Sequence, residues 1–202
     1  MAEPFPTPLR FDVEFHGPFR VATGSAKPGF DAVGNPTDPV PASAIKGAAR
    51  HVARDILGFP DVIVNRLFGS ARQAAPWAWT GLEFATGDPT TWSRARVSID
   101  DDTGTAIPGA LQFGEEMWAD DRATFSVSRI GPADTDLEND ALLIAAAACG
   151  IHAIGGLRRR GYGWITVRFD PDTVGSDAAP AGVEDWPKAA ATAVLKARGA
   201  AV

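Results

Sequence analysis

Cysteine and histidine are scarce in this chain. One cysteine, Cys149, and three histidines occur among 202 residues. A lone cysteine cannot close a disulfide within the chain, and Cys149 lies in an alanine-rich apolar stretch, so we interpret it as a small core residue. A chain that forms no internal disulfide suits a reducing compartment.

Long hydrophobic runs are also missing. No stretch of 18 consecutive apolar residues is present, as a membrane-spanning helix would need. The first residues, Met-Ala-Glu-Pro-Phe-Pro, lack the positive charge and the following apolar segment of a secretory signal. We therefore expect a cytoplasmic protein that is neither exported nor inserted into a membrane.

Positive charge is in deficit. Lys and Arg number 19 against 25 Asp and Glu, which gives a formal net charge of −6 and a pI near 5.0. Domains that bind nucleic acids are usually basic, so this balance argues against such binding unless the cations gather on one face. The length and the 45% hydrophobic content predict one globular domain with a sizeable core.

Glycine and arginine are concentrated in one segment, residues 155–163, between an apolar helix and a short strand. Its candidate RNA-binding residues are Gly155, Gly156, Arg158, Arg159, Arg160, Gly161 and Tyr162. Glycines let another chain approach the backbone N–H groups, and guanidinium groups match phosphate oxygens. The segment fits a loop that grips a nucleic-acid backbone without reading bases. A glycine helix cap followed by a solvated basic turn explains it equally well.

The remaining pattern mixes strands and helices. Alternating apolar residues predict strands at 9–15, 77–85, 94–99, 122–130 and 162–169. Helical periodicity predicts helices at 43–57 and 137–154, and an alanine-rich helix at about 184–198. Residues 17–42 are rich in Gly, Pro and Asp and form a long loop, which inside a compact domain is usually functional or disordered.

The first predicted helix has two distinct faces. Ser43 is its expected N-cap, and Ile45 begins an apolar stripe that faces the core. Lys46, Arg50 and Arg54 recur every four residues on another side and form a basic ridge. A solvated surface is the commoner explanation of such a charge run, and contact with phosphates is the alternative.

These elements predict an α+β, ferredoxin-like (RRM-like) fold, with helices on one face of the sheet and the other face available for a ligand. We expect one domain over 1–169, a linker at 170–183 and a helical tail at 184–202. An excursion at about 100–118 interrupts the sheet, and the Gly-rich loop precedes the last core strand.

Three stretches resemble one family in the family's own order. Residues 40–50, Val-Pro-Ala-Ser-Ala-Ile-Lys-Gly-Ala-Ala-Arg, resemble the I-P-G/A-S-S-L-K-G-A-L-R helix start of the RAMP superfamily of CRISPR-associated proteins. The segment Val97–Ala106, Val-Ser-Ile-Asp-Asp-Asp-Thr-Gly-Thr-Ala, resembles its V-x-I-D-R-x-T-G-x-A motif. Residues 155–163 resemble its G-G-x-R-S-R-G-Y-G loop.

Within that superfamily the chain most resembles the small backbone subunit of type III effector complexes. The resemblance implies a RAMP fold whose palm binds guide RNA, with complementary target RNA, other effector subunits and copies of itself or related proteins as partners. It also implies that residues 100–118 form a thumb-like excursion and that Lys46, Arg50 and the Gly-rich loop face RNA phosphates.

Subunits of this kind often cut target RNA with a divalent metal, using an aspartate between the first strand and the first helix. The carboxylates of that loop are Asp31 and Asp38, and Asp31 is the better positional match. The resemblance thus implies a metal-dependent endoribonuclease with Mg²⁺ as cofactor and Asp31 as catalytic residue, Asp38 being the alternative.

Other features favour different functions. The family's arginine in I-D-R is Asp101 here, within an acidic turn at 100–102, which together with the net negative charge favours a non-catalytic structural or capping subunit. A guide-processing endoribonuclease would need a histidine for acid–base chemistry. His16 and His51 are its candidates, whereas His152 lies in the apolar helix pattern and is interpreted as a core residue.

Overall fold

The computed structural model describes residues 8–25, 27–119, 122–130, 137–170 and 185–199. Apart from Asp170, the expected linker at 170–183 lies outside the described residues, as does residue 184. Within the described part, no helix has the length and apolar character needed to cross a membrane.

The central sheet is antiparallel and built around β1 (Leu9–Phe15). β1 pairs with β6 (Ala123–Arg129) on one side and β7 (Ile165–Asp170) on the other. β2 (Trp77–Trp79) and β3 (Glu83–Phe84) both pair with the far edge of β6. The order β2-β6-β1-β7 is that of a ferredoxin-like sheet, which confirms the predicted α+β fold.

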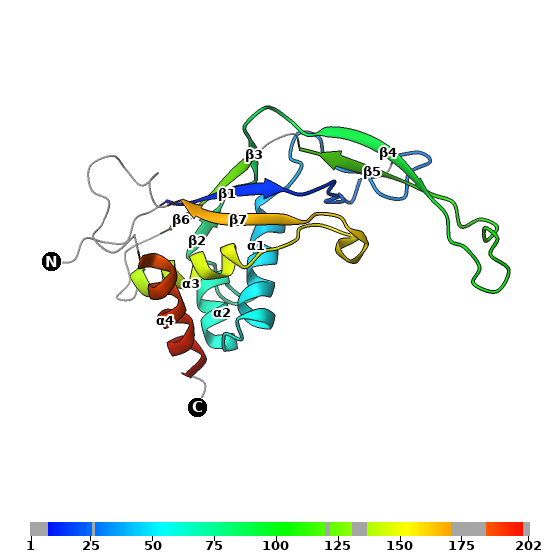
Figure 1. Ribbon diagram of the computed structural model, residues 1–202. Helices are drawn as coiled ribbons and strands as arrows, with labels where there is room; N and C mark the ends of the chain where they lie inside the picture. The colour runs from blue at the N-terminus through cyan, green and yellow to red at the C-terminus, as the bar shows by residue number, and fades with distance from the viewer. Residues whose placement is uncertain (1–7, 26, 120–121, 131–136, 171–184, 200–202) are drawn as a thin grey trace.

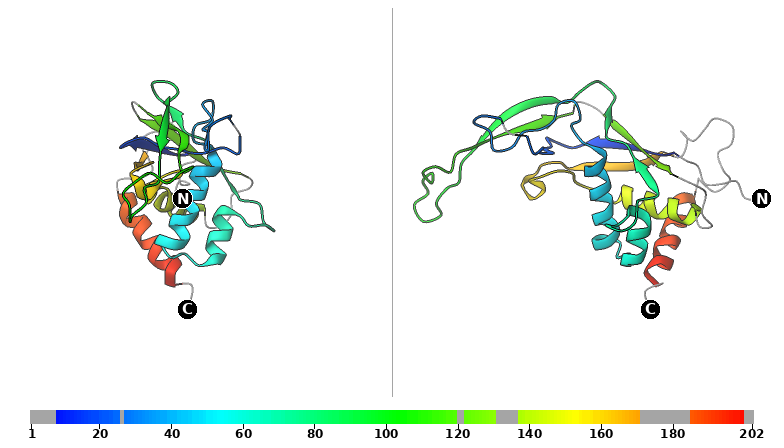
Figure 2. Two further views of the ribbon diagram at one scale, coloured as in Figure 1. Left: turned by 90° about the vertical axis from the view of Figure 1, so that its right-hand side faces the viewer. Right: turned by 180° about the vertical axis from the view of Figure 1, so that it is seen from behind.

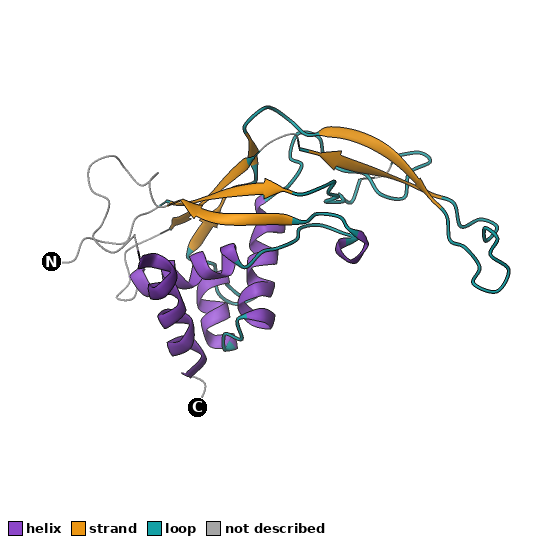
Figure 3. Ribbon diagram, viewed as in Figure 1, coloured by secondary structure: helices purple, strands orange, loops and turns teal. Residues whose placement is uncertain are grey.

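All the described α-helices cover one face of this sheet (Figure 3). They are α1 (Ala42–His51), α2 (Asp61–Phe68), α3 (Leu137–Cys149) and α4 (Trp186–Gly199). Strand alternation sends Leu9, Phe11 and Val13 into the core between sheet and helices, where the Phe11 ring stacks on Phe125 with centroids 4.7 Å apart. Three buried alanines of α4 complete this layer, which packs α4 against α3: Ala190, Ala193 and Ala197.

Two local predictions require correction. The first helix begins at Ala42 with Pro41 as its N-cap instead of Ser43, since the Pro41 carbonyl accepts the N–H of Ala44 at 2.9 Å. The α-helix ends at His51 and continues as a π-helical turn, η1 (Val52–Ile56).

The predicted strand at 77–85 is two short strands. Between them Leu82 donates its N–H to the Val40 carbonyl at 3.0 Å instead of to β6. A Cβ on Gly81 would lie 3.1 Å from the same oxygen. Pairing with Val40 therefore breaks the ladder at this point.

A β-hairpin projects from the sheet (Figures 1 and 2). Its arms are β4 (Thr90–Arg96) and β5 (Gln112–Trp118), paired from Thr90 with Trp118 to Arg96 with Gln112. The excursion is thus longer than the predicted 100–118, because its first strand starts at Thr90. Residues 97–111 form the loop at its far end.

The long loop before α1 runs along the free edge of β5. Phe19 and Met117 exchange two backbone hydrogen bonds of 2.9 Å, and Glu115 donates its N–H to the Ala32 carbonyl at 3.0 Å. Asp31 donates its N–H to the Phe113 carbonyl at 2.8 Å. The loop therefore anchors the hairpin to the body of the protein.

The Gly-rich loop packs on the same segment. Gly156 donates to the Arg20 carbonyl and Gly163 to the Pro18 carbonyl, both at 2.8 Å. A Cβ on Gly155 would lie 2.1 Å from the Arg20 oxygen, and one on Gly163 would lie 2.0 Å from the Ile154 oxygen. Both glycines also have positive φ, so other residues would be strained as well as crowded.

Gly163→Ala should destabilise the protein by about 2 kcal/mol or more, since the new methyl group collides with backbone while φ is +69°. The matched control is Gly161→Ala, where φ is +80° but no atom lies within 4 Å of the added Cβ. Urea unfolding of both variants separates crowding from strain. Equal losses would show that the close approach to Ile154 contributes nothing.

Candidate nucleic-acid interface

One face of the hairpin carries aromatic and basic side chains. Trp92, Arg94 and Arg96 alternate along β4 and so share a face, and Trp92 is paired across the ladder with Glu116 of β5. The side chains of Trp92 and Trp118 are 59% and 40% exposed, which is unusual for tryptophan. They border an open hollow lined by Thr90, Trp92, Ser93, Arg94, Glu116 and Trp118.

Glu116 organises this face. Its side chain is 2% exposed and accepts hydrogen bonds from Arg94 at 2.8 and 3.2 Å, from the Tyr162 hydroxyl at 2.5 Å and from the Trp118 indole at 3.4 Å. Burial raises the pKa of Glu116, but the hydrogen bonds from these three side chains outweigh it, and the pKa lies below the usual value. Because Tyr162 belongs to the Gly-rich loop, one carboxylate joins that loop to the hairpin.

Two further arginines converge here without carboxylate partners. Arg20 donates its Nε–H to the Glu115 carbonyl at 2.7 Å and lies against Gly114, where a Cβ would be 2.3 Å from its Nη2. The Arg96 guanidinium lies 4.7 Å from the centroid of the Tyr162 ring. The Nη2 atoms of both arginines are buried and have no hydrogen-bond partner among the described residues.

The two guanidinium groups influence each other. Burial, and then the charge of Arg96, lowers the pKa of Arg20. Arginine side chains in general carry a positive charge at neutral pH. Like charges held together with unused N–H groups favour an anion in their neighbourhood, because it relieves the repulsion and accepts the hydrogen bonds.

The Gly-rich loop supplies the opposite wall. Arg158–Arg160 form a short 3₁₀ turn, η2, bounded by Leu157 at φ 61° and Gly161 at φ 80°. All three arginine side chains are exposed, and the Trp164 indole donates to the Arg158 carbonyl at 3.1 Å. We call this surface the cradle; it comprises Arg20, Trp92, Arg94, Arg96, Trp118 and residues 158–162.

The three residues of the basic ridge predicted on the first helix have different surroundings in the structure. Arg50 donates to the Gly69 carbonyl at 2.9 Å and to Asn65 Oδ1 at 3.0 Å, which ties α1 to α2. Arg54 is exposed and bonds to Asp55 at 2.9 Å. Lys46 is half-buried, and burial followed by the charge of Arg50 lowers its pKa. Of the three, Lys46 is the one whose charge is not engaged by another described side chain.

The loop carboxylates lie in different surroundings. Asp31 is at the edge of β5, where Oδ2 accepts the Phe113 N–H at 2.9 Å, while Asp38 Oδ1 lies beside Gly81. Among the described residues no group of three or more His, Cys, Asp or Glu could hold a metal. Mg²⁺ is commonly held by one or two carboxylates together with water and substrate phosphates, so exposed Asp31 fits a minimal site of that kind.

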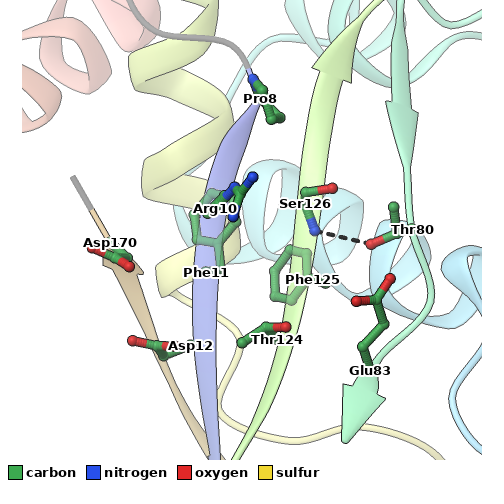
Figure 4. A pocket seen from close by; sticks show the side chains of 10 residues that line it. All are labelled: Pro8, Arg10, Phe11, Asp12, Thr80, Glu83, Thr124, Phe125, Ser126 and Asp170. Atoms are coloured by element: carbon green, nitrogen blue, oxygen red, sulfur yellow. Dashed lines mark hydrogen bonds between the residues drawn. The ribbon is translucent and has the colours of Figure 1, made fainter. Parts of the chain in front are cut away.

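The sheet face opposite the helices is polar. Figure 4 shows a pocket there lined by Pro8, Arg10, Phe11, Asp12, Thr80, Glu83, Thr124, Phe125, Ser126 and Asp170. Its carboxylates outnumber its single arginine, and Phe11 and Phe125 are buried on the core side. The described residues that line this pocket therefore offer neither exposed rings for base stacking nor an excess of positive charge for phosphates.

Two of the three histidine side chains contact residues outside the cradle. His16 Nε2 lies 2.6 Å from Thr166 Oγ1, and His51 Nδ1 lies 2.5 Å from Asp55 Oδ2. The interpretation of His152 as a core residue was wrong, because α3 ends at Cys149 and His152 is exposed in the segment that follows. Cys149 does pack against the core, and burial raises its pKa to about 11.

Comparison with known families decides the classification. The model of the RAMP superfamily matches residues 12–166. The chain belongs to the RAMP superfamily. The match spans the sheet, the hairpin and the Gly-rich loop of this RAMP protein, and it confirms the resemblance seen in the three sequence motifs.

Solved structures share the fold. A chain from the cryo-EM structure of the type III-B Cmr-beta bound to cognate target RNA has a TM-score of 0.60 and 11% identity, and the match covers 82% of this RAMP chain and 98% of that chain. A chain from the type III-B Cmr-beta apo state has a TM-score of 0.61 and 10% identity, with coverage of 83% and 99%. A search of curated protein sequences found no match.

Sequence reasoning missed two important residues. Arg20 stands in an irregular loop without periodicity, so nothing in the sequence indicated that it would reach β5. Glu116 follows another glutamate, and only strand alternation distinguishes the two. Glu115 bonds Lys27 at 2.6 Å, while Glu116 points to the other face of the strand and accepts the hydrogen bond of the Tyr162 hydroxyl in the cradle.

Glu116→Gln should cost about 2 kcal/mol of unfolding free energy at neutral pH, since a buried charged acceptor of the Arg94 and Tyr162 hydrogen bonds is lost. The folded pKa is lowered, so the advantage of wild type should be full above the unfolded value near 4.5 and disappear as pH falls through the folded value. Glu14→Gln, which removes the exposed partner of Arg168, should change stability little. Equal effects of both substitutions would contradict the role of Glu116.

Proposed function

We propose that this RAMP protein is a guide-RNA-binding backbone subunit of a type III-like CRISPR effector complex. The observation that carries the proposal is the composition of the cradle. Arg20 and Arg96 lack carboxylate partners among the described residues, and the exposed rings of Trp92 and Trp118 belong to the same surface. Family membership and the shared fold of type III-B Cmr-beta chains support it.

The proposed contacts are mainly with the RNA backbone. Arginine N–H groups bind phosphate oxygens without regard to sequence, and the exposed indole rings offer stacking surfaces to any base. Arg158–Arg160 supply three more exposed charges on the Gly-rich loop, and half-buried Lys46 supplies a further charge on α1. The assembly would also contain complementary target RNA, other effector subunits and further copies of this or related RAMP chains.

The cradle explains how a protein with a negative net charge could bind RNA. The chain carries −6 overall, yet acidic groups are described on the open sheet face and in the hairpin turn, and Glu116 in the cradle is already paired with Arg94. RNA binding requires positive potential only along the groove that the RNA follows.

Arg20→Ala and Arg96→Ala should each weaken binding of single-stranded RNA by the isolated chain about tenfold and reduce the slope of log K against log salt by ~1, because each removes one phosphate contact. The matched control is Arg168→Ala on the open sheet face, whose arginine pairs with Glu14. Fluorescence anisotropy at several salt concentrations gives both quantities. Unchanged slopes for the two cradle variants would refute their role.

The proposal includes cleavage of target RNA at Asp31. The second carboxylate oxygen of Asp31 is available for Mg²⁺ or for the attacking 2′-hydroxyl, and a bound Mg²⁺ would stabilise charge on the scissile phosphate. One observation favours the alternative of a non-catalytic structural or capping subunit: Asp31 already has a structural partner, the Phe113 N–H of β5.

Asp31→Asn separates these two functions. An asparagine oxygen can still accept the Phe113 N–H, so the loop should keep its place while the charge that would hold Mg²⁺ is lost. In an assembled complex with guide RNA and Mg²⁺, we expect at least ~100-fold slower cutting of complementary RNA with guide binding retained. Asp38→Asn tests the alternative catalytic residue: slower cutting by that variant alone would assign catalysis to Asp38, and undiminished cutting by both variants would establish the structural function instead.

A further inference from the structure

Trp164 is an exposed aromatic residue outside the cradle. It directly precedes β7, and its side chain is 56% exposed, whereas tryptophan is usually buried over most of its surface. Because Ile165 and Val167 point into the core, strand alternation places Trp164 on the open face of the sheet. The polar pocket of Figure 4 lies at the other end of that face, beside the first residues of β1.

The backbone and the ring of Trp164 are both held in place. The indole Nε1–H donates to the Arg158 carbonyl at 3.1 Å, and the Trp164 carbonyl accepts the His16 N–H at 3.0 Å. The preceding residue, Gly163, is itself fixed by its hydrogen bond to the Pro18 carbonyl at 2.8 Å. A ring held in this way loses little conformational entropy when a ligand stacks on it.

The surroundings of Trp164 are cationic. Arg158–Arg160 are exposed, and none of the three forms an ion pair with another described residue. His16 is exposed and lies opposite Trp164 in the register of β1 with β7. The carboxylate at this end of the open face belongs to Glu14, which is paired with Arg168 at 2.8 Å. The arginines beside the ring are therefore available to an anionic ligand.

These local features distinguish between classes of ligand. Among the described residues twelve large hydrophobic side chains are exposed, and none of the other eleven belongs to β1, β7 or the Gly-rich loop. A protein partner would normally cover a contiguous apolar patch, which this part of the surface lacks. A fixed indole ring beside free guanidinium groups instead matches single-stranded nucleic acid, whose bases stack on aromatic rings while its phosphates bind arginine.

We propose that Trp164 stacks on an unpaired base of RNA, while Arg158–Arg160 bind the adjoining phosphates. This inference rests on the proposed function and adds a base contact to it. Tyr162 connects the Gly-rich loop to the hairpin through Glu116, whereas Trp164 faces the open sheet, so RNA that crosses the loop from the cradle would meet this ring. The contact holds a base without identifying it, because every base has a π-face.

The first test compares Trp164→Ala with Trp164→Phe in binding of single-stranded RNA by the full chain at several salt concentrations. Trp164→Ala should weaken binding about tenfold with an unchanged salt slope, because it removes a stacking contact and no phosphate contact. Trp164→Phe keeps a ring but loses the hydrogen bond to the Arg158 carbonyl, and it should stay within about threefold of wild type. Leu195→Ala, at a 67% exposed position of α4, is the matched control and should bind as wild type.

Three outcomes of this test would overturn the stacking contact. They are undiminished binding by Trp164→Ala, equal losses for the alanine and phenylalanine variants, and a reduced salt slope, since the last two would show that the indole only positions the arginines. Unchanged salt slopes for the Arg20 and Arg96 variants would contradict the proposed cradle. Normal binding by Trp164→Ala beside altered cradle variants would overturn the stacking contact alone.

The second test leaves the protein unchanged and identifies the RNA strand. Photoreactive 5-iodouridine is placed at one position at a time in the guide or in the complementary target of the assembled complex. Irradiation should join an unpaired iodouridine of one strand to the peptide that contains Trp164, and the strand that reacts is the source of the stacked base. Absence of this product at every position of both strands would overturn the proposal.

Discussion

Two adjacent carboxylates on β5 hold the functional parts of this protein together. Because neighbours on a strand point to opposite faces, Glu115 and Glu116 reach different segments. Glu115 bonds Lys27 and the Gly34 N–H of the long loop, and Glu116 bonds Arg94 and Tyr162. Both side chains are less than 10% exposed, so their partners are needed to offset the cost of burying charge. The position of the hairpin relative to the Gly-rich loop depends on these two residues.

The arrangement also explains how an acidic protein can present a basic groove. In the cradle, the Glu116 carboxylate already accepts hydrogen bonds from Arg94 and Tyr162, while Arg20 and Arg96 retain N–H groups without a partner among the described residues. Elsewhere cations are neutralised locally, as in the pairs Arg54–Asp55 and Arg168–Glu14. Net charge therefore says little about the local field, because it does not distinguish engaged cations from available ones.

The sequence was sufficient for features that depend on periodicity or on glycine. Alternation in Leu9–Phe15 predicted β1 and its buried face, and the glycines at 155 and 163 marked the loop ahead of the last core strand, which packs on the protein's own backbone. The sequence was insufficient where the environment of a residue is formed by residues far away in the sequence. Arg20 reaches Glu115, the 77–85 strand is broken by Val40, and Arg50 is engaged by α2. None of these contacts leaves a local pattern, so the sequence indicated the Gly-rich loop as a candidate but not that Arg20 and Glu116 would connect the hairpin to the rest of the protein.

The long loop covers one edge of β5, which leaves β4 as the outer edge of the arm. Unpaired strand edges on a projecting hairpin are prone to join those of other molecules and aggregate. Along β4 the exposed residues are mostly polar, and Arg94 and Arg96 add charge near the end of the strand. Positive side chains on such an edge repel a second copy of the same edge. Arg94 and Arg96, which we propose to contact RNA, would thus also disfavour edge-to-edge pairing of two copies of the arm.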